Sequence, residues 1–139
     1  MDPVAVDTDV ASLLIKRRLP NDMARLLAGR PLVLTFVTLG ELTRWVEQRQ
    51  WGPHRREMLS RWLMGKHVLH SDRNVATTWG TITAYAALRG RPRPANDSWI
   101  AACCLAYGVP LATRNIKDYE DFAEHEGLVI IGQASSPHD

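Results

Sequence analysis

Four carboxylates stand where an apolar stretch of the sequence gives way to a turn or to the start of a helix. Each is flanked by apolar residues, beside which an unpaired charge is costly to bury. A divalent cation offsets that cost when several carboxylates share it. The sequence therefore predicts a metal site whose catalytic and metal-binding residues are Asp7, Glu41, Asp97 and Asp118.

The chemistry of these side chains indicates which ion such a site would hold. All four supply oxygen atoms, and the five histidines are scattered along the chain without metal-ligand spacing. This donor set favours Mg²⁺ or Mn²⁺ over Zn²⁺. Neighbouring polar residues are expected to orient the carboxylates or to add a neutral oxygen, and they are Asp9, Ser98, Thr113 and Asn115.

Each acid also has a local explanation that needs no metal. Asp7 can initiate a turn, Asp97 can cap a helix, and Asp118 can be exposed to solvent. Glu41 stands three residues after Thr38, which is the spacing of a capping box. Four separate coincidences at the ends of successive elements are less expected than one shared site.

Short apolar segments alternate with longer stretches of helical periodicity. We expect strands at 4–7, 32–37, 67–71, 111–113 and 128–131, and helices at 10–18, 22–28, 38–50, 55–64, 72–88 and from residue 96 or 97 onward. This alternation favours an α/β fold, namely a three-layer α/β/α sandwich with a mainly parallel central sheet. Ligand sites in such sheets form beyond the carboxyl ends of the strands, where the four acids are expected to converge.

The composition fits a single domain in a reducing compartment. Of the 139 residues, 45% are hydrophobic and 23% are charged, which suffices for a core without disulfides. We expect one domain over 1–133 and a frayed tail over 134–139. Cys103 and Cys104 are adjacent and are expected to be buried thiols. With no apolar run of membrane-spanning length and no secretory signal pattern, a cytoplasmic protein is predicted.

The charge balance points to a polyanionic partner. The 17 Lys and Arg residues exceed the 15 Asp and Glu residues by only two. If one site sequesters four acids, however, 17 cations face 11 remaining acids on the rest of the molecule. An acidic pocket within a basic surface suits a polyanion that is held close to metal ions.

In their order and spacing, these segments resemble the PIN-domain ribonucleases, specifically the VapC-type toxins of bacterial toxin–antitoxin pairs. The resemblance runs from residue 3 to residue 131, and its motifs are specific only when taken together. They are Asp7-Thr8 after the first strand, Gly40-Glu41-Leu42, the stretch from Asn96 to Ala102, Leu111 to Asn115 with Asp118-Tyr119, and Gly127 to Ile131.

The resemblance implies a PIN-like α/β/α sandwich and a metal-dependent endoribonuclease that cleaves RNA. Asp7, Glu41, Asp97 and Asp118 would be its acidic quartet around Mg²⁺ or Mn²⁺, with Asp121 as a less favoured substitute for the fourth acid. It also implies a homodimer and a small antitoxin protein in an apolar groove, whose walls would be helices within 10–28 and 38–64. Candidate RNA contacts near the site are Arg89, Arg91, Arg93 and Arg114.

The five tryptophans divide into two groups. Four of them fall on apolar helix faces and are expected in the core or at an interface. Trp51, beside Gly52, is the one predicted as an exposed contact.

Two other classes of protein share parts of this pattern. Asp7-Thr8-Asp9-Val10 matches the nucleophile motif of haloacid-dehalogenase-like phosphatases, in which Asp7 would attack a phosphate. A non-enzymatic receiver-like signalling domain of similar size also begins with acids after its first strand. The phosphatase class requires a later lysine, and it leaves Glu41 unexplained. The receiver-like class requires a lysine at the end of the last strand, and none follows that strand here.

Overall fold

The computed structural model describes residues 2–132, so the expected tail at 134–139 lies outside the described residues. Within that range five strands form one sheet in the order β3-β2-β1-β4-β5, and every neighbouring pair is parallel. The strands are β1 (Val4–Val6), β2 (Leu32–Thr35), β3 (His67–Leu69), β4 (Leu111–Ala112) and β5 (Ile130–Ile131).

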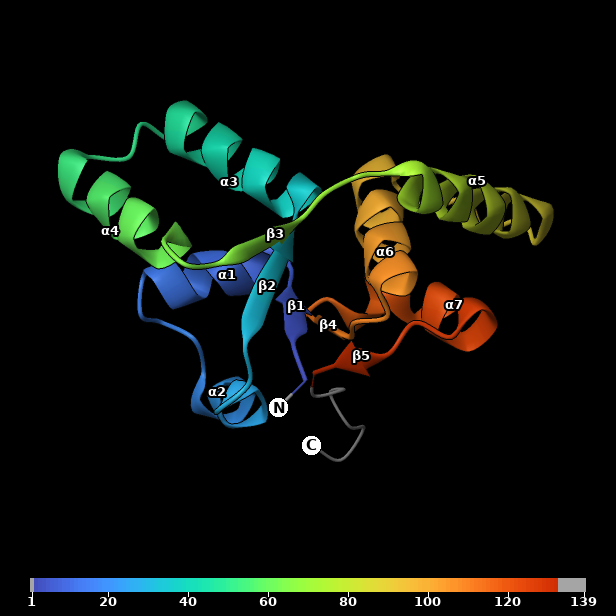
Figure 1. Cartoon of the computed structure of the whole chain (residues 1–139), viewed down its shortest axis with the longest axis horizontal. Coiled ribbons are helices and arrows are strands. Elements are labelled where there is room, and N and C mark those ends of the chain that lie inside the picture. The colour runs from blue at the N-terminus through green and yellow to red at the C-terminus, as the bar shows by residue number, and fades with distance from the viewer. Residues whose placement is uncertain (1, 133–139) are drawn as a thin grey trace.

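Helices cover both faces of this sheet. Figure 1 shows α1 to α4 on one side of the strands and α5 to α7 on the other. They are α1 (Thr8–Ile15), α2 (Asn21–Leu27), α3 (Phe36–Gln48), α4 (Pro53–Leu63), α5 (Arg73–Leu88), α6 (Ala95–Tyr107) and α7 (Ile116–Glu126). The predicted three-layer α/β/α sandwich with a parallel sheet is confirmed. None of the helices in the described part of the chain is long and apolar enough to cross a membrane.

The core consists of two apolar layers that the sheet separates. Val4 and Val6 belong to the layer under α1 to α4, whereas Ala5 belongs to the layer under α5 to α7. Adjacent side chains of a strand point to opposite faces, and both faces here are buried. This explains why the strands read as uninterrupted apolar runs in the sequence.

The strand order creates a crevice at the carboxyl end of β1. From β1 the chain moves outward through β2 to β3, and it then crosses to β4 on the other side of β1. Val6 pairs with Ala112, and the Asp7 amide donates to the Ala112 carbonyl over 3.1 Å. The residues after β1 and β4 are therefore neighbours, at the kind of position where parallel sheets bind ligands.

The boundaries of helix α1 and of the strands correct three of the expectations from sequence. Helix α1 begins at Thr8 instead of Val10, because the Asp7 side chain accepts a hydrogen bond from the Val10 amide at 2.8 Å. It ends at Ile15 instead of Arg18, because Arg17 adopts a positive φ of 56°. The strands are shorter than expected by one or two residues each.

The expected capping box of α3 is not formed. The cap is Thr35, whose hydroxyl accepts from the Thr38 amide at 3.2 Å, and the helix starts at Phe36. Glu41 is thus more than one turn inside the helix and is free for other contacts. Helix α6 similarly starts at Ala95 after Pro94, which places Asp97 in its first turn and not at its cap. Helix α7 was not anticipated from the sequence.

The candidate acidic site

The four predicted acids come from four different elements and line one cavity of about 340 Å³. Asp7 follows β1, Glu41 lies on α3, and Asp97 and Asp118 lie in the first turns of α6 and α7. The complete lining is Asp7, Thr8, Asp9, Glu41, Trp45, Asp97, Ile100, Asn115, Asp118 and Tyr119. Residues separated by more than 100 positions thus meet at the crevice that the strand order creates.

Asp7 is the most deeply buried of the four acids, with 4% of its surface exposed. Burial raises its pKa from 3.8 to about 6, although hydrogen bonds from Thr113 and from the Val10 amide oppose the shift. The charges of Asp9 and Asp97 raise the pKa further. A carboxyl group in this position holds its negative charge at a cost that a bound cation would offset.

Thr113 fixes the orientation of Asp7. Its buried hydroxyl donates to Asp7 Oδ2 at 2.5 Å and accepts from the Asn115 amide at 2.9 Å. Gly132 packs directly against the Thr113 carbonyl oxygen, where a Cβ atom would overlap it. Because both oxygens of Asp7 have hydrogen-bond donors, the side chain is held in one rotamer.

Glu41 is held from two sides. Thr8 donates a short hydrogen bond of 2.5 Å to Oε1, and the Asn96 side-chain amide donates to Oε2 at 3.0 Å. These contacts join the starts of α1 and α6 to α3. Thr8 and Asn96 were not predicted as site residues, since a threonine after Asp7 and an asparagine before Asp97 look like ordinary cap residues.

Asp97 is coupled to the other acids. Burial is the main cause of its raised pKa, and the charges of Asp118 and Glu41 add to it. The Tyr119 hydroxyl donates to Asp97 Oδ1 at 3.3 Å, and this bond and the Arg93 charge both act to lower the pKa. Tyr119 is 3% exposed. Its role was missed because the expected loop after residue 113 is in fact helix α7.

Of the other polar residues predicted for the site, some line the cavity and some do not. Asp118 and Asn115 line the cavity, and Asp9 does too, with Arg114 3.8 Å from its carboxylate. Asp121 is instead buried beside Arg89 and does not line the cavity, so the substitute for the fourth acid is not supported. Ser98 was expected to orient a carboxylate of the site. Its hydroxyl instead donates to the Pro94 carbonyl at 2.9 Å, and Ser98 does not line the cavity.

The arginines that were predicted to contact RNA lie in different surroundings. Arg89 is directed to α7, where its guanidinium lies 2.6 Å from Asp121 and 3.3 Å from Glu126. Arg91 is exposed, while Arg93 is partly buried and close enough to Asp97 to affect its pKa. Trp51 is 5% exposed and belongs to the core, so the prediction of an exposed contact there is wrong.

The donor set of the cavity fits an oxygen-binding cation. The lining supplies five carboxylates and one amide oxygen, with no histidine or cysteine. Among the residues that the structure describes, however, no three such side chains are arranged to hold a single ion. Oxygen-binding divalent cations in proteins can take one or two carboxylates and complete their coordination with water.

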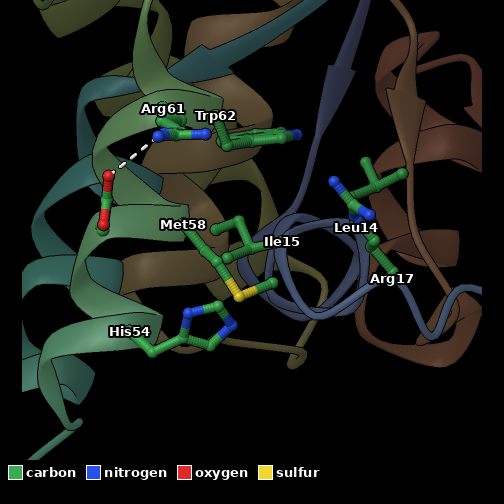
Figure 2. A pocket seen from close by; sticks show the side chains of 8 residues that line it. Leu14, Ile15, Arg17, His54, Met58, Arg61 and Trp62 are labelled. Carbon is green, nitrogen blue, oxygen red and sulfur yellow. Dashed lines mark hydrogen bonds and ion pairs between the residues drawn. The ribbon is translucent and has the colours of Figure 1, made fainter.

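A larger concavity of about 610 Å³ lies between α1 and α4, away from the acids (Figure 2). Figure 2 shows Ile15 and Met58 facing one another across it, with the rings of His54 and Trp62 at the side of α4. We call it the α1–α4 groove, and its lining residues are Leu14, Ile15, Arg17, His54, Glu57, Met58, Arg61 and Trp62. Its single acid, Glu57, is paired with Arg61 at 3.0 Å, so the groove offers apolar and cationic contacts.

Comparison with known proteins gives matches over nearly the whole described chain. A family model described as the PIN domain matches residues 4–125. Ribonuclease VapC4 from Mycobacterium tuberculosis is 30% identical over 105 residues, which cover 74% of this chain and 80% of that protein. Ribonuclease VapC1 from Haemophilus influenzae is 25% identical over 118 residues, covering 83% and 88%.

A solved structure supports the same fold. It is VapBC-5 from M. tuberculosis, a member of the VapBC family of toxin–antitoxin systems, at a TM-score of 0.73 and 23% identity. The match covers 94% of this chain and 98% of that one. The topology also excludes the receiver-like alternative, because that class has the strand order 2-1-3-4-5, whereas the order here is 3-2-1-4-5. The cavity lining includes no lysine for a phosphatase of the haloacid-dehalogenase type.

Proposed function

Because this chain belongs to the PIN domain family, we propose that it is a metal-dependent endoribonuclease and the toxin of a toxin–antitoxin pair. The substrate would be RNA, the cleaved bond a phosphodiester, and the place of action the cytoplasm. The observation that carries the proposal is the convergence of Asp7, Glu41, Asp97 and Asp118 on one cavity.

The electrostatics of the cavity explain why a cation belongs to the reaction. The neighbouring carboxylates that raise the pKa values of Asp7 and Asp97 repel a phosphodiester as well. Mg²⁺ or Mn²⁺, when bound, supplies positive charge and Lewis-acid chemistry toward the phosphodiester and its attacking water. Asp7 and Asp97 are the residues that we expect to hold the ion, since theirs are the carboxyl groups whose ionised state is least favourable without it.

The other residues of the site position these acids. Thr113 holds Asp7 and Tyr119 contacts Asp97, while Thr8 and Asn96 fix both oxygens of Glu41. Carboxylates held before substrate arrives need less reorganisation during the reaction.

The test compares RNA cleavage by the wild type with that by Asp7→Asn, in Mg²⁺, Mn²⁺ or EDTA. Asp72→Asn is a matched control, because Asp72 also caps a helix through a 2.8 Å bond to a backbone amide but is exposed and remote from the cavity. We expect discrete metal-dependent fragments from the wild type and the control, and at least a 100-fold loss in Asp7→Asn. Equal cleavage by Asp7→Asn would contradict the proposal.

We further propose that the antitoxin binds in the α1–α4 groove. The groove combines apolar contacts from Leu14, Ile15 and Met58 with the cations Arg17 and Arg61. It therefore fits an amphipathic segment that carries apolar and acidic side chains, in the way that helices bind to grooves. The VapBC-5 structure, from a family of toxin–antitoxin systems, has the same fold.

Two methionines of the same helix region provide a direct test. Met58 lines the groove, whereas Met64 lies at the end of α4 and is 77% exposed. We expect Met58→Glu to weaken binding of the cognate antitoxin by about 100-fold or more, through a buried charge and repulsion of an acidic partner. Met64→Glu should leave the affinity unchanged, and equal effects of both would exclude the groove.

The proposed assembly also includes a homodimer. Leu88 and Tyr85 at the end of α5 are 83% and 51% exposed, and such apolar residues are candidates for burial between two copies. Sedimentation equilibrium should give twice the chain mass for the wild type and one chain mass for Leu88→Glu. A monomeric wild type would contradict this part of the proposal.

A further inference from the structure

A group of four cations lies where α1, α3 and α4 meet, outside the acidic cavity. It consists of Lys16, Arg18, Arg49 and Arg55, and we call it the basic cluster. Lys16 and Arg49 are the C-caps of α1 and α3, and Arg55 is the third residue of α4. Burial lowers the pKa of Lys16, and the charges of Arg55, Arg49 and Arg18 lower it further. The three arginines are therefore close enough to Lys16 for their charges to act on it.

The members of this cluster form no close ion pair in the described part of the chain, although the charge of Asp9 acts on Lys16 and opposes the lowering of its pKa. Among the described residues, none of the four cations lies within 4.0 Å of a carboxylate oxygen, whereas the nearby Arg56 and Arg61 each pair with a glutamate at 3.0 Å. Arg49, Arg55 and Arg18 are exposed to solvent. An uncompensated cluster of this kind weakens the fold through repulsion and attracts polyanions.

Helix stability explains only part of the arrangement. A cation at a helix C-terminus is favourable, which accounts for Lys16 and Arg49. Arg55 instead stands in the first turn of α4, where a cation opposes the helix dipole and where the helix has no acidic residue. Arg55 is therefore placed against the stability of its own helix.

An aromatic side chain connects the basic cluster to the acidic cavity. Trp45 lines that cavity, and the guanidinium of Arg49 lies over its ring, 4.4 Å from the centroid. Lys16 lies over the ring of Trp51 at 5.4 Å. Both cations are thus in contact with an aromatic ring, although Arg49 is also exposed to solvent. Arg49 thus stands beside a wall of the cavity, and the other cations of the cluster belong to the end of α1 and the start of α4, on the same side of the sheet as α3 (Figure 1).

We propose that the basic cluster binds the RNA strand that leaves the acidic cavity, with Trp45 and Arg49 as the first contact beyond the scissile phosphate. The inference rests on the proposed ribonuclease function and adds to it the path of the substrate. RNA is favoured over an acidic protein here because Arg49 stacks on Trp45, which lines the cavity that the substrate must enter. A tryptophan with a stacked guanidinium also suits an unpaired base followed by a phosphate.

The alternative RNA contacts at the other side of the cavity are weaker. Arg89 is bound to Asp121 and Glu126, and the Arg114 guanidinium lies 3.8 Å from Asp9. These neighbouring carboxylates reduce the charge that either arginine presents to a phosphate. Arg91 and Arg93 also act on carboxyl groups, namely those of Asp121 and Asp97, whose pKa values their charges act to lower. The strand is therefore expected to leave the cavity toward α3 and not toward α7.

The first experiment measures binding without cleavage. All proteins carry Asp7→Asn, and the probe is a fluorescent single-stranded RNA of about 16 nucleotides, followed by anisotropy at several salt concentrations. The test variant is Arg49→Gln with Arg55→Gln. The matched control is Arg25→Gln with Arg73→Gln, which removes two other exposed arginines that make no ion pair among the described residues.

The expected result is a loss of about tenfold in RNA affinity for the test variant near 0.1 M salt. The slope of log K against log salt should fall by about 1.4, because each phosphate contact with a single strand contributes about 0.7. The control should match the parent in both quantities. Equal affinity and slope in the test variant would overturn the proposal, provided that circular dichroism shows it folded like the control.

The second experiment separates this inference from the ribonuclease proposal. In the otherwise wild-type enzyme, Arg49→Gln with Arg55→Gln should raise KM for a long RNA and leave its kcat unchanged. Cleavage of a dinucleotide, which has no phosphate beyond the scissile one, should also be unchanged. If the wild type cleaves RNA and the variant does so with the same KM, the ribonuclease proposal stands and the inference about the basic cluster is overturned. If the variant loses antitoxin affinity while its RNA affinity stays unchanged, the cluster serves the protein partner and the proposal is wrong.

Discussion

Replacing Asp7 with asparagine is expected to stabilise the protein in the absence of metal at neutral pH. Burial raises the pKa of Asp7 from 3.8 to about 6, so ionising this carboxyl group is harder in the folded state than in the unfolded chain. The difference between the two values corresponds to about 3 kcal/mol of folding free energy. Asparagine carries no charge, so folding of the variant does not include the cost of ionising a buried carboxyl group.

The asparagine can keep the local hydrogen bonds. Its side-chain oxygen can accept from the Val10 amide, as Asp7 Oδ1 does at 2.8 Å. Its NH₂ group would face Thr113, whose hydroxyl donates to Asp7 in the wild type and would have to turn to accept. This adjustment reduces the gain, and we expect Asp7→Asn to be more stable than the wild type by about 1–3 kcal/mol at neutral pH.

The pH dependence gives the sign of the effect. A folded-state pKa above the unfolded value means that the wild type is most stable, as far as Asp7 is concerned, below about pH 4. That stability is lost as the pH rises through about 6. The raised pKa of Asp97 acts in the same direction. The advantage of Asp7→Asn should therefore be absent near pH 4 and complete near pH 7.

Urea unfolding in EDTA, followed by circular dichroism between about pH 4 and pH 7.5, measures this advantage. Asp72→Asn is the control, since it retains an exposed helix cap and should change the unfolding free energy by about 0.5 kcal/mol or less at every pH. If Asp7→Asn is no more stable than the wild type at neutral pH while the control is neutral, the burial of an unfavourable charge at Asp7 is refuted.

Three further substitutions test individual contacts of the site. Thr113→Val removes the donor to Asp7 and should weaken Mn²⁺ binding by about fivefold in calorimetry, while Thr113→Ser restores it. Tyr119→Phe should raise the Mg²⁺ concentration for half-maximal cleavage by about two- to fivefold, whereas Tyr107→Phe, which removes a hydroxyl bonded to a backbone carbonyl elsewhere, should not. Arg89→Met should lower the melting temperature, because it removes the guanidinium that lies 2.6 Å from the buried Asp121 carboxylate. It should leave kcat unchanged, because Arg89 does not line the acidic cavity.

The parts of the site that the sequence predicts are those with a chemical signature. An acid beside an apolar run is unusual, and four of them in the order of successive strands and helices indicate a shared location. The parallel sheet follows from short apolar runs that alternate with helical periodicity. These two arguments need only the residue types and their order, and together they place Asp7, Glu41, Asp97 and Asp118 at one edge of the sheet.

The hydrogen bonds that orient these acids depend on tertiary contacts. Thr8 reaches Glu41 across 33 positions and Thr113 reaches Asp7 across 106, so local spacing gives no sign of either bond. The capping-box spacing at Thr38 is misleading, because Thr35 caps the helix one turn earlier. Trp51 looked exposed beside a Gly-Pro break, yet it packs beneath Lys16. In each case a local pattern competes with packing, and packing decides the outcome.

The charges of this molecule are arranged at the expense of its stability in two places. Burial and neighbouring acids raise the pKa values of Asp7 and of the half-buried Asp97, and burial and neighbouring cations lower that of Lys16. Both groups border the cavity that contains Trp45, one directly and the other through Arg49. A cation would relieve the first group and a polyanion the second. Because RNA with Mg²⁺ or Mn²⁺ supplies both at once, metal and substrate together should stabilise the fold more than either does alone.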